Sequence, residues 1–116
     1  MTIFRITPSS YFGDAATLAT ADRDGLRLFV SALQSAQITG VACFDSEGVQ
    51  HRIEQQSGAA VLEAARDSVV WRLDIEKIEE IIDLAESLIV RGAGGHQYVD
   101  IDSPTSTLVI SVDEPG

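Results

Sequence analysis

The chain has 116 residues, a formal charge of −10 and one cysteine. This length suits one α+β domain spanning residues 1–116, and it allows a single core without disulfides or metals. The acidic balance disfavours a nucleic-acid partner, because phosphate binding draws on clustered Lys and Arg. We also expect a cytoplasmic protein without membrane contact, because the sequence has no signal-peptide pattern and no apolar run near the roughly 18 residues of a membrane span.

A strand and an irregular connection are predicted at the start of the chain. Residues 2–7 alternate loosely and are rich in β-branched and aromatic types. Pro8 is expected to end this strand, because proline removes a backbone donor. Residues 9–20 show no clear period, which favours an irregular connection.

A first helix is predicted over residues 22–37. Thr20 or Asp22 can serve as its N-cap, and Gly25 weakens its first turn. The segment that follows, residues 41–55, is predicted to form a hairpin with a short turn at Ser46, Glu47 and Gly48. Setting Phe44 opposite Val49 places His51 on the core side of the hairpin. A core or edge histidine with its hydrogen bonds satisfied is a better interpretation of this residue than a metal ligand.

Three further elements are predicted between residues 59 and 91. Residues 59–66 leave two alternatives: their alanines favour a helix, whereas their length and the bounding Gly58 and Asp67 favour a short strand, which we choose. Residues 69–73 are interpreted as a strand with Val69, Trp71 and Leu73 on its buried face. A long helix over 75–91 has an apolar stripe and is expected to start at Asp74 as N-cap. Gly92 is expected to end this helix, and the stretch GAGG that follows is a connector, since phosphate loops precede helices.

The chain is predicted to close with a hairpin. Residues 96–102 alternate, with Gln97, Val99 and Ile101 on the core side and His96, Tyr98, Asp100 and Asp102 facing out. Pairing Asp102 with Thr107 would set Ile101 opposite Leu108 and Val99 opposite Ile110. The outward set could be taken for an acid/base cluster, but a solvent-facing hairpin explains it equally well.

No motif in the sequence points to an enzyme. There is no nucleophile elbow, Walker loop, paired CxxC or HExxH motif. Cys43 sits at an alternating apolar position, where a buried inert thiol is the ordinary interpretation. We therefore expect no catalytic residues, no metal and no cofactor, and a protein that acts by binding.

Four stretches carry a resemblance: VVWRLD, the helix with KIEEIIDLAESL, GGHQYVDI and SPTSTLVISVDE. Together they resemble small bacterial α+β proteins, mostly uncharacterised, whose relatives include immunity proteins of polymorphic toxin systems. The resemblance covers about residues 69–114, and no catalytic residue carries over. It implies an antiparallel sheet packed by helices and, for some relatives, neutralisation of a toxin by direct binding.

The predicted fold is α+β, an antiparallel sheet of five to seven strands covered on one face by two helices. Burial of Trp71 is expected most strongly, because a large aromatic beside the main helix has few other uses. The predicted core comprises Phe4, Ile6, Leu26, Phe29, Val30, Leu33, Phe44, Ile53, Trp71, Leu73, Ile78, Ile82, Leu88, Val99, Ile101, Leu108 and Ile110.

The functional hypothesis rests on charge. Residues 1–73 carry 8 acidic and 6 basic side chains, net −2, whereas residues 74–116 carry 10 acidic and 2 basic, net −8. A basic protein partner, such as a toxin domain, would meet this surface. The alternatives are a homodimer or other homo-oligomeric accessory protein and, less favoured, a small-molecule-binding protein or enzyme. The expected partner-binding residues are Glu76, Glu79, Glu80, Asp83, Glu86, His96, Tyr98, Asp100 and Asp102.

Overall fold

The computed structural model describes residues 2–11, 13–91 and 95–112. Within these residues the chain forms eight strands and two helices, and the strands make two mixed sheets of four. Sheet A has the order β1 (Phe4–Tyr11), β2 (Asp14–Ala21), β8 (Thr107–Val112), β7 (His96–Asp100). Sheet B has the order β3 (Val41–Ser46), β4 (Val49–Gln55), β6 (Ser68–Leu73), β5 (Ala60–Ala64).

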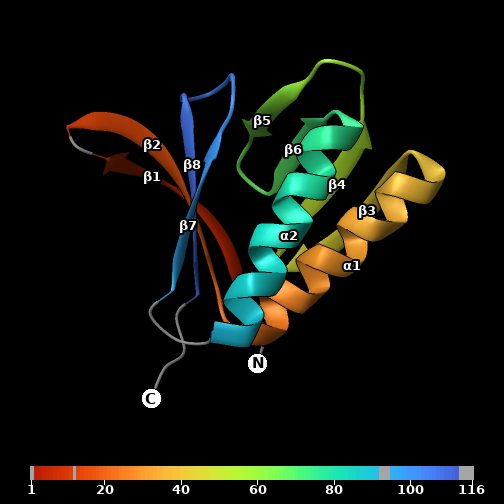
Figure 1. The fold of residues 1–116 in the computed structure, drawn as a ribbon, viewed down its shortest axis with the longest axis horizontal. Coiled ribbons are helices and arrows are strands. Elements are labelled where there is room, and N and C mark those ends of the chain that lie inside the picture. Colours follow the sequence, from red (N-terminus) through yellow and green to blue (C-terminus); the bar gives the residue numbers. More distant parts are fainter. Residues whose placement is uncertain (1, 12, 92–94, 113–116) are drawn as a thin grey trace.

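The two helices form a pair against the sheets. α1 (Arg23–Thr39) packs on β3 and β4, and α2 (Ile75–Arg91) contacts α1 and reaches β7 and β8. Figure 1 shows the helices side by side in front of sheet B, with sheet A to their left. Each helix therefore carries the chain from one sheet to the other: α1 follows β2 of sheet A and leads to β3 of sheet B, and α2 makes the return crossing.

This crossing explains where the predicted fold was wrong. The α+β class and both helices are confirmed, but there are two mixed sheets in place of one antiparallel sheet of five to seven strands. In each sheet the central pair is parallel, β2 with β8 and β4 with β6. Parallel neighbours need a crossover connection: the one from β2 to β8 passes through both helices and the whole of sheet B, whereas the one from β4 to β6 passes through β5 at the edge of the same sheet. Hairpin patterns in the sequence cannot reveal such a pairing.

The first hairpin is longer than expected. β1 continues through Pro8 to Tyr11 and pairs with β2, so residues 9–20 are not an irregular connection. β1 is an edge strand, which is where a sheet tolerates a residue without a backbone donor. The short strand expected within residues 59–66 is confirmed as β5.

The β3–β4 hairpin has a different register from the predicted one. Glu47 and Gly48 both have positive φ, 52° and 80°, as in the two-residue turn that best matches strand twist. Ser46 therefore pairs with Val49, and Phe44 pairs with His51. The prediction that His51 faces the core is nevertheless confirmed, because its side chain is only 1% exposed.

The closing hairpin is also offset from the prediction. Asp100, not Asp102, pairs with Thr107, so Val99 lies opposite Leu108. The loop after Asp100 leaves β8 and pairs with the edge of β5. There the Asp102 N–H donates to the Ala60 carbonyl at 2.8 Å, and the Leu62 N–H donates to the Ser103 carbonyl at 3.0 Å. These contacts between the sheets take the loop residues out of the hairpin ladder.

Both helices begin at an aspartate: Asp22 is one of the two caps predicted for α1, and Asp74 is the cap predicted for α2. Asp22 accepts a hydrogen bond from the Gly25 N–H at 2.7 Å, and Asp74 accepts one from the Lys77 N–H at 2.7 Å. α1 ends at Gly40, which has a left-handed φ of 90° and donates its N–H to the Ala36 carbonyl. The predicted stop at Gly92 and most of the GAGG connector lie outside the described residues.

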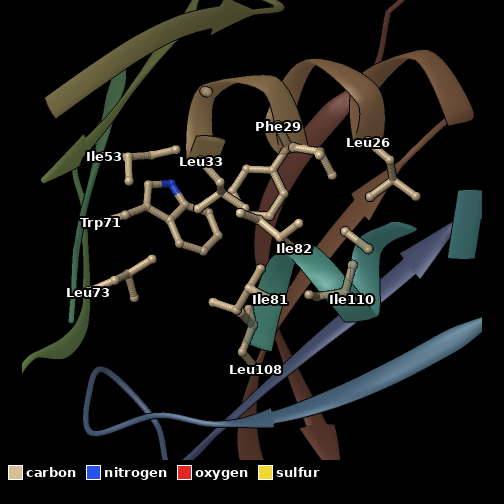
Figure 2. Close-up of a cluster of buried hydrophobic side chains, with 14 of the residues drawn as sticks. Leu26, Phe29, Leu33, Ile53, Trp71, Leu73, Ile81, Ile82, Leu108 and Ile110 are labelled. Carbon is tan, nitrogen blue, oxygen red and sulfur yellow. The ribbon is translucent and has the colours of Figure 1, made fainter. Parts of the chain in front are cut away.

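One hydrophobic core fills the space between the helices and the two sheets. Trp71 and Ile53 of sheet B face Phe29 and Leu33 of α1, while Ile110 approaches from sheet A (Figure 2). Trp71 is fully buried, as predicted, and its ring centroid lies 4.9 Å from that of Phe29. Every other residue of the predicted core is also buried except Ile6, which is partly buried against it.

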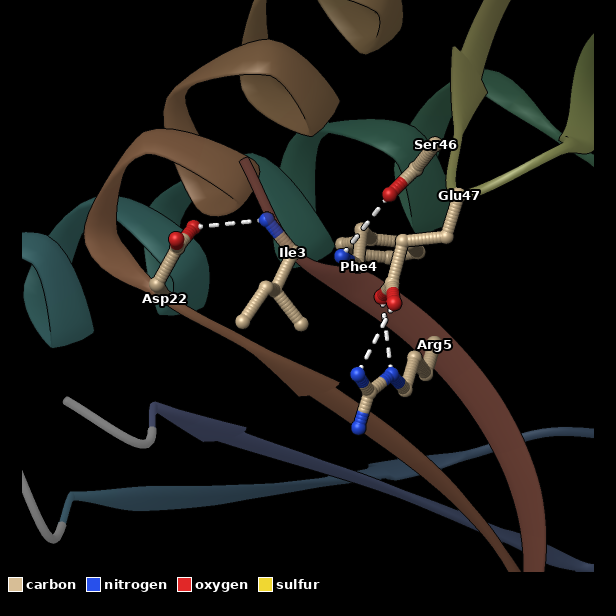
Figure 3. Close-up of polar contacts among 6 residues, drawn as sticks. All are labelled: Ile3, Phe4, Arg5, Asp22, Ser46 and Glu47. Atoms are coloured by element: carbon tan, nitrogen blue, oxygen red, sulfur yellow. Dashed lines mark hydrogen bonds and ion pairs between the residues drawn. The ribbon is translucent and has the colours of Figure 1, made fainter. Parts of the chain in front are cut away.

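The start of β1 ties sheet A to the turn between β3 and β4. The Phe4 N–H donates to Ser46 Oγ at 3.0 Å, and Arg5 holds the Glu47 carboxylate through two bonds of 2.7 and 2.8 Å (Figure 3). The Ile3 N–H donates to the Asp22 carboxylate at 3.0 Å. One short segment therefore joins the β3–β4 turn, β1 and the N-terminus of α1.

Candidate functional site

The predicted helix carboxylates form one exposed surface. They recur at spacings of three and four on the side of α2 opposite the buried Ile78, Ile81 and Leu88, and all are exposed. Of these α2 carboxylates, only that of Glu80 has an ion-pair partner among the described residues, the Lys77 ammonium at 2.8 Å. We call this surface the α2 acidic face; its members are Glu76, Glu79, Glu80, Asp83 and Glu86.

α1 provides an internal contrast. The two helices have the same length, 17 residues, and lie in contact. α1 carries one acidic and two basic side chains, net +1, and its Asp24 is paired with Arg27 at 3.1 Å. α2 carries five acidic and two basic side chains, net −3. The negative charge of the helix layer thus belongs to α2.

The remaining predicted partner-binding residues lie elsewhere. His96, Tyr98 and Asp100 are exposed on β7, and they alternate with Val99, which is 1% exposed and belongs to the core beneath the helices. They therefore project from the outer face of sheet A, away from α2. Asp102 is exposed in the loop that pairs with β5. The structure does not bring these four residues onto the α2 acidic face.

A groove between the helices adjoins the acidic face. It encloses about 320 Å³, and its lining includes Val30 and Gln34 from α1 and Glu86, Ile89 and Val90 from α2. Val90 is 85% exposed, although its side chain is apolar. Sequence reasoning missed this groove; the available signal was an apolar residue at an outward position of an otherwise acidic helix.

His51 occupies a second candidate site inside sheet B. Its ring stacks on Phe44 with centroids 4.7 Å apart, and its Nδ1 accepts a hydrogen bond from Trp71 Nε1 at 3.2 Å. Burial lowers the pKa of His51 to about 4, against a weaker opposing effect of Asp45. Within the described part of the chain, Nε2 has no hydrogen-bond partner. The contact with Trp71 crosses the parallel β4–β6 pair, so no local sequence pattern predicts it.

Cys43 is exposed, which corrects the expectation of a buried thiol. It lies on the outer face of sheet B opposite Arg52, while its neighbour Phe44 takes the buried position. His51 pairs with Phe44 and points to the other face of the same sheet. The structure therefore does not assemble a cysteine–histidine pair from these residues.

The described part of the chain holds neither a metal-binding cluster nor a membrane-spanning helix. Residues 2–11, 13–91 and 95–112 contain no group of three or more His, Cys, Asp and Glu side chains arranged to hold a metal ion. No helix among these residues is long and apolar enough to cross a membrane.

Comparisons with protein-family models, with curated proteins and with solved structures find no match to this chain. The resemblance to immunity proteins accordingly stays a prediction from the sequence.

Proposed function

We propose that this chain is a binding protein of the immunity type, which captures a basic protein partner through the α2 acidic face. The observation that carries the proposal is the charge contrast between two adjacent helices of equal length, +1 on α1 and −3 on α2. A surface that served only solubility has no need to gather its carboxylates on one of two adjacent helices. Concentrated charge of one sign accelerates encounter with a partner of the opposite sign.

The interhelical groove supplies the second element that an interface needs. Binding energy in protein interfaces concentrates in a few apolar or aromatic anchors that fill pockets, while surrounding charges set orientation and encounter rate. Val90 and Ile89 form an apolar wall beside Glu86. A partner with an apolar side chain flanked by Lys or Arg would fill the groove and meet the carboxylates together.

The test uses purified basic protein domains encoded beside this chain's gene, with affinity measured by surface plasmon resonance. Glu79→Gln combined with Asp83→Asn raises the charge by two on the acidic face, and neither residue has an ion-pair partner among the described residues. We expect association to slow about threefold to tenfold, with the melting temperature unchanged, because exposed carboxylates contribute little to stability.

A matched control raises the charge by the same amount at a distance from α2. Ser9→Lys combined with Asp14→Asn changes two exposed residues near the turn of the β1–β2 hairpin, which projects away from the helices (Figure 1). This control should bind nearly as the wild type does. Equal loss in both double variants would mean that only net charge matters, and binding of none of the neighbouring domains would contradict the proposal.

The groove is tested separately with Val90→Asp. This change places a charge on the apolar wall and should weaken binding at least tenfold, mainly through faster dissociation. Ile38→Asp is the control, because Ile38 is 86% exposed at the end of α1 and does not line the groove. If both variants bind as the wild type does, the groove takes no part in the interface.

A further inference from the structure

A second cleft lies between the two sheets, next to His51. It encloses about 320 Å³, at the small end of the usual ligand-pocket range of about 300 to 1,000 Å³. β1 supplies one wall, and the β3–β4 turn, β4 and the β5–β6 turn supply the other. Phe4, Ile6, Val49 and Val69 make its lining largely apolar. We call it the inter-sheet cleft.

The buried imidazole in the cleft wall has a defined proton. The indole N–H of Trp71 can only donate, so His51 Nδ1 must be the unprotonated, accepting nitrogen. The neutral ring therefore carries its hydrogen on Nε2. That N–H is a donor on a side chain that is 1% exposed, and no described residue accepts from it. Buried donors are almost always satisfied, so an acceptor from outside the chain is expected here.

The other polar groups of the cleft also favour an acceptor ligand. Ser46 Oγ accepts from the Phe4 N–H, which leaves its own proton available. The single carboxylate in the lining, Glu47, is already held by both bonds from Arg5. Arg66 lines the cleft with an exposed side chain and forms no ion pair among the described residues. The inter-sheet cleft therefore has a cationic rim with hydrogen-bond donors and an apolar interior.

We propose that the inter-sheet cleft binds a small carboxylic acid with an apolar body. The carboxylate would face the Arg66 guanidinium and accept from Ser46 Oγ, and it would accept from His51 Nε2 once binding displaces the side chains that cover this buried nitrogen. The apolar body would lie against Phe4, Ile6 and Val69. A cationic ligand would meet Arg66 and a single carboxylate, Glu47, that Arg5 already holds, and a bare inorganic anion would leave the apolar walls in contact with water. This site is independent of the α2 acidic face, so either proposal can fail without the other.

Titration calorimetry with n-alkanoates tests the site. Hexanoate should bind the wild-type protein and acetate should bind at least about tenfold more weakly, because acetate leaves the apolar walls unfilled. Hexan-1-amine and inorganic phosphate should show no binding at the same concentration. No binding of any alkanoate, or phosphate binding as tightly as hexanoate, would overturn the proposal.

His51→Leu removes the donor and keeps an apolar side chain of similar size. Hexanoate affinity should fall at least about tenfold, as expected when a hydrogen bond to a buried polar group is lost. Arg66→Gln should weaken binding about threefold, whereas Arg91→Gln, which changes an exposed arginine of α2, should leave it unchanged. Equal affinity in the wild type and in His51→Leu would contradict the assigned role of His51.

A measurement on the unmodified protein covers the case in which the variant fails to fold. Proton–nitrogen NMR of the imidazole reports the Nε2–H resonance of His51 directly. Saturation with hexanoate should shift this resonance more than that of His96, which is exposed on β7. An Nε2–H resonance that ignores hexanoate would mean that a bound water alone satisfies the donor, and the proposal would be wrong.

Discussion

The two halves of the chain have the same architecture. Residues 3–56 run β1-β2-α1-β3-β4, and residues 59–112 run β5-β6-α2-β7-β8. If each strand of one half is replaced by its counterpart in the other half, β1 by β5 through β4 by β8, the strand order of sheet A becomes that of sheet B. The central pair of each sheet is parallel. The N-cap aspartates match in detail: the Asp22 N–H donates to the Ile3 carbonyl, and the Asp74 N–H donates to the Ala59 carbonyl. Figure 1 shows the resulting pairing of the helices.

The halves differ in the sizes of the core residues that they contribute. Trp71 and Leu73 of the second half correspond to Ala19 and Ala21 of the first, by their positions before the helix caps. At another pair of positions the first half has the large residue: Phe4 corresponds to Ala60 of the second half. All of these residues are buried in one cluster. Large side chains from one half therefore complement small ones from the other, and the core is complete only when both are present.

They differ as well in what they carry on the surface. The first half, residues 1–56, holds 6 acidic and 4 basic side chains, net −2, and the second half holds 12 acidic and 4 basic, net −8. His51 of β4 stands where β8 has Leu108, two residues before the matching Ile53 and Ile110. The shared features build the fold, and both proposed binding sites arise where the halves depart from each other.

Removal of Trp71 should break the complementarity of the core most severely. We predict that Trp71→Ala lowers the free energy of unfolding by about 3 to 5 kcal/mol, because the corresponding position already holds Ala19 and nothing can fill the space. Chemical denaturation measures this change, with Val90→Ala as the exposed control, expected within about 0.5 kcal/mol. A loss below about 1 kcal/mol would mean that Trp71 is not a core residue.

The comparison also explains what the sequence could predict of the fold. Alternation and helical periodicity are local, so they located both helices and the burial of Trp71. The strand β5 was assigned from its short length and the bounding Gly58 and Asp67, against the helix preference of its alanines. The pairing of β2 with β8 joins the two ends of the chain, and the pairing of β4 with β6 skips the intervening strand β5, so neither is encoded in a local hairpin pattern. Both predicted hairpin registers were wrong. The geometry of the turn at Glu47 and Gly48 sets the register of the β3–β4 hairpin, and hydrogen bonds to the edge of β5 take the loop of the β7–β8 hairpin out of its ladder.

The same limit applies to the candidate sites. Exposure of the α2 carboxylates follows from the periodicity of one helix, and it was predicted correctly. The interhelical groove and the inter-sheet cleft lie between elements whose relative placement depends on the two-sheet assembly. His51 was expected to face the core, but its bond to Trp71 requires β4 and β6 to be neighbours.

His51 of the first half should make the stability of the protein depend on pH. The pKa of His51 is lowered to about 4 in the folded protein, whereas the unfolded chain binds the proton near the ordinary value of 6.5. The unfolded state therefore holds more protons between these values, and stability falls as the pH drops through this window, by about 3 kcal/mol in full. Denaturation at pH 7 and pH 4 measures the loss.

The matched comparison is His51→Leu, which gives β4 the residue found in β8. Carboxylates titrate in the same window, so the difference between wild type and variant isolates the histidine. The variant should lose about 3 kcal/mol less than the wild type on acidification. Identical pH dependence in the two proteins would show that the pKa of His51 is not lowered.

Gly25 should mark a steric difference between the helices. A Cβ at Gly25 would lie 1.8 Å from the Ile3 carbonyl oxygen, whereas the matching position of α2, three residues after its cap, holds Lys77. We predict that Gly25→Ala destabilises by about 1 to 3 kcal/mol in spite of the better helix propensity of alanine. For Lys77→Ala, thermal melts should show a change in the free energy of unfolding of less than about 1 kcal/mol. An increase in stability for Gly25→Ala would refute the close approach of β1.

The caps should give the smallest difference. Asp74→Ala is expected to destabilise by about 1 kcal/mol through loss of the bond from the Lys77 N–H. Asp22→Ala should destabilise the protein more than Asp74→Ala does, by up to about 1 kcal/mol in the free energy of unfolding, because Asp22 also accepts a hydrogen bond from the Ile3 N–H. Denaturant titration of the two variants under identical conditions makes the comparison. Equal losses would indicate that the Ile3 bond contributes nothing.

The salt dependence of association tests most directly whether α2 binds a basic partner. Stopped-flow mixing of this chain with the cognate basic domain should give an association rate constant that falls by about an order of magnitude from low to physiological ionic strength. The slope should be shallower for Glu79→Gln/Asp83→Asn than for the Ser9→Lys/Asp14→Asn control. A rate constant insensitive to salt, or equal slopes in the two variants, would contradict the proposal that α2 is the binding helix.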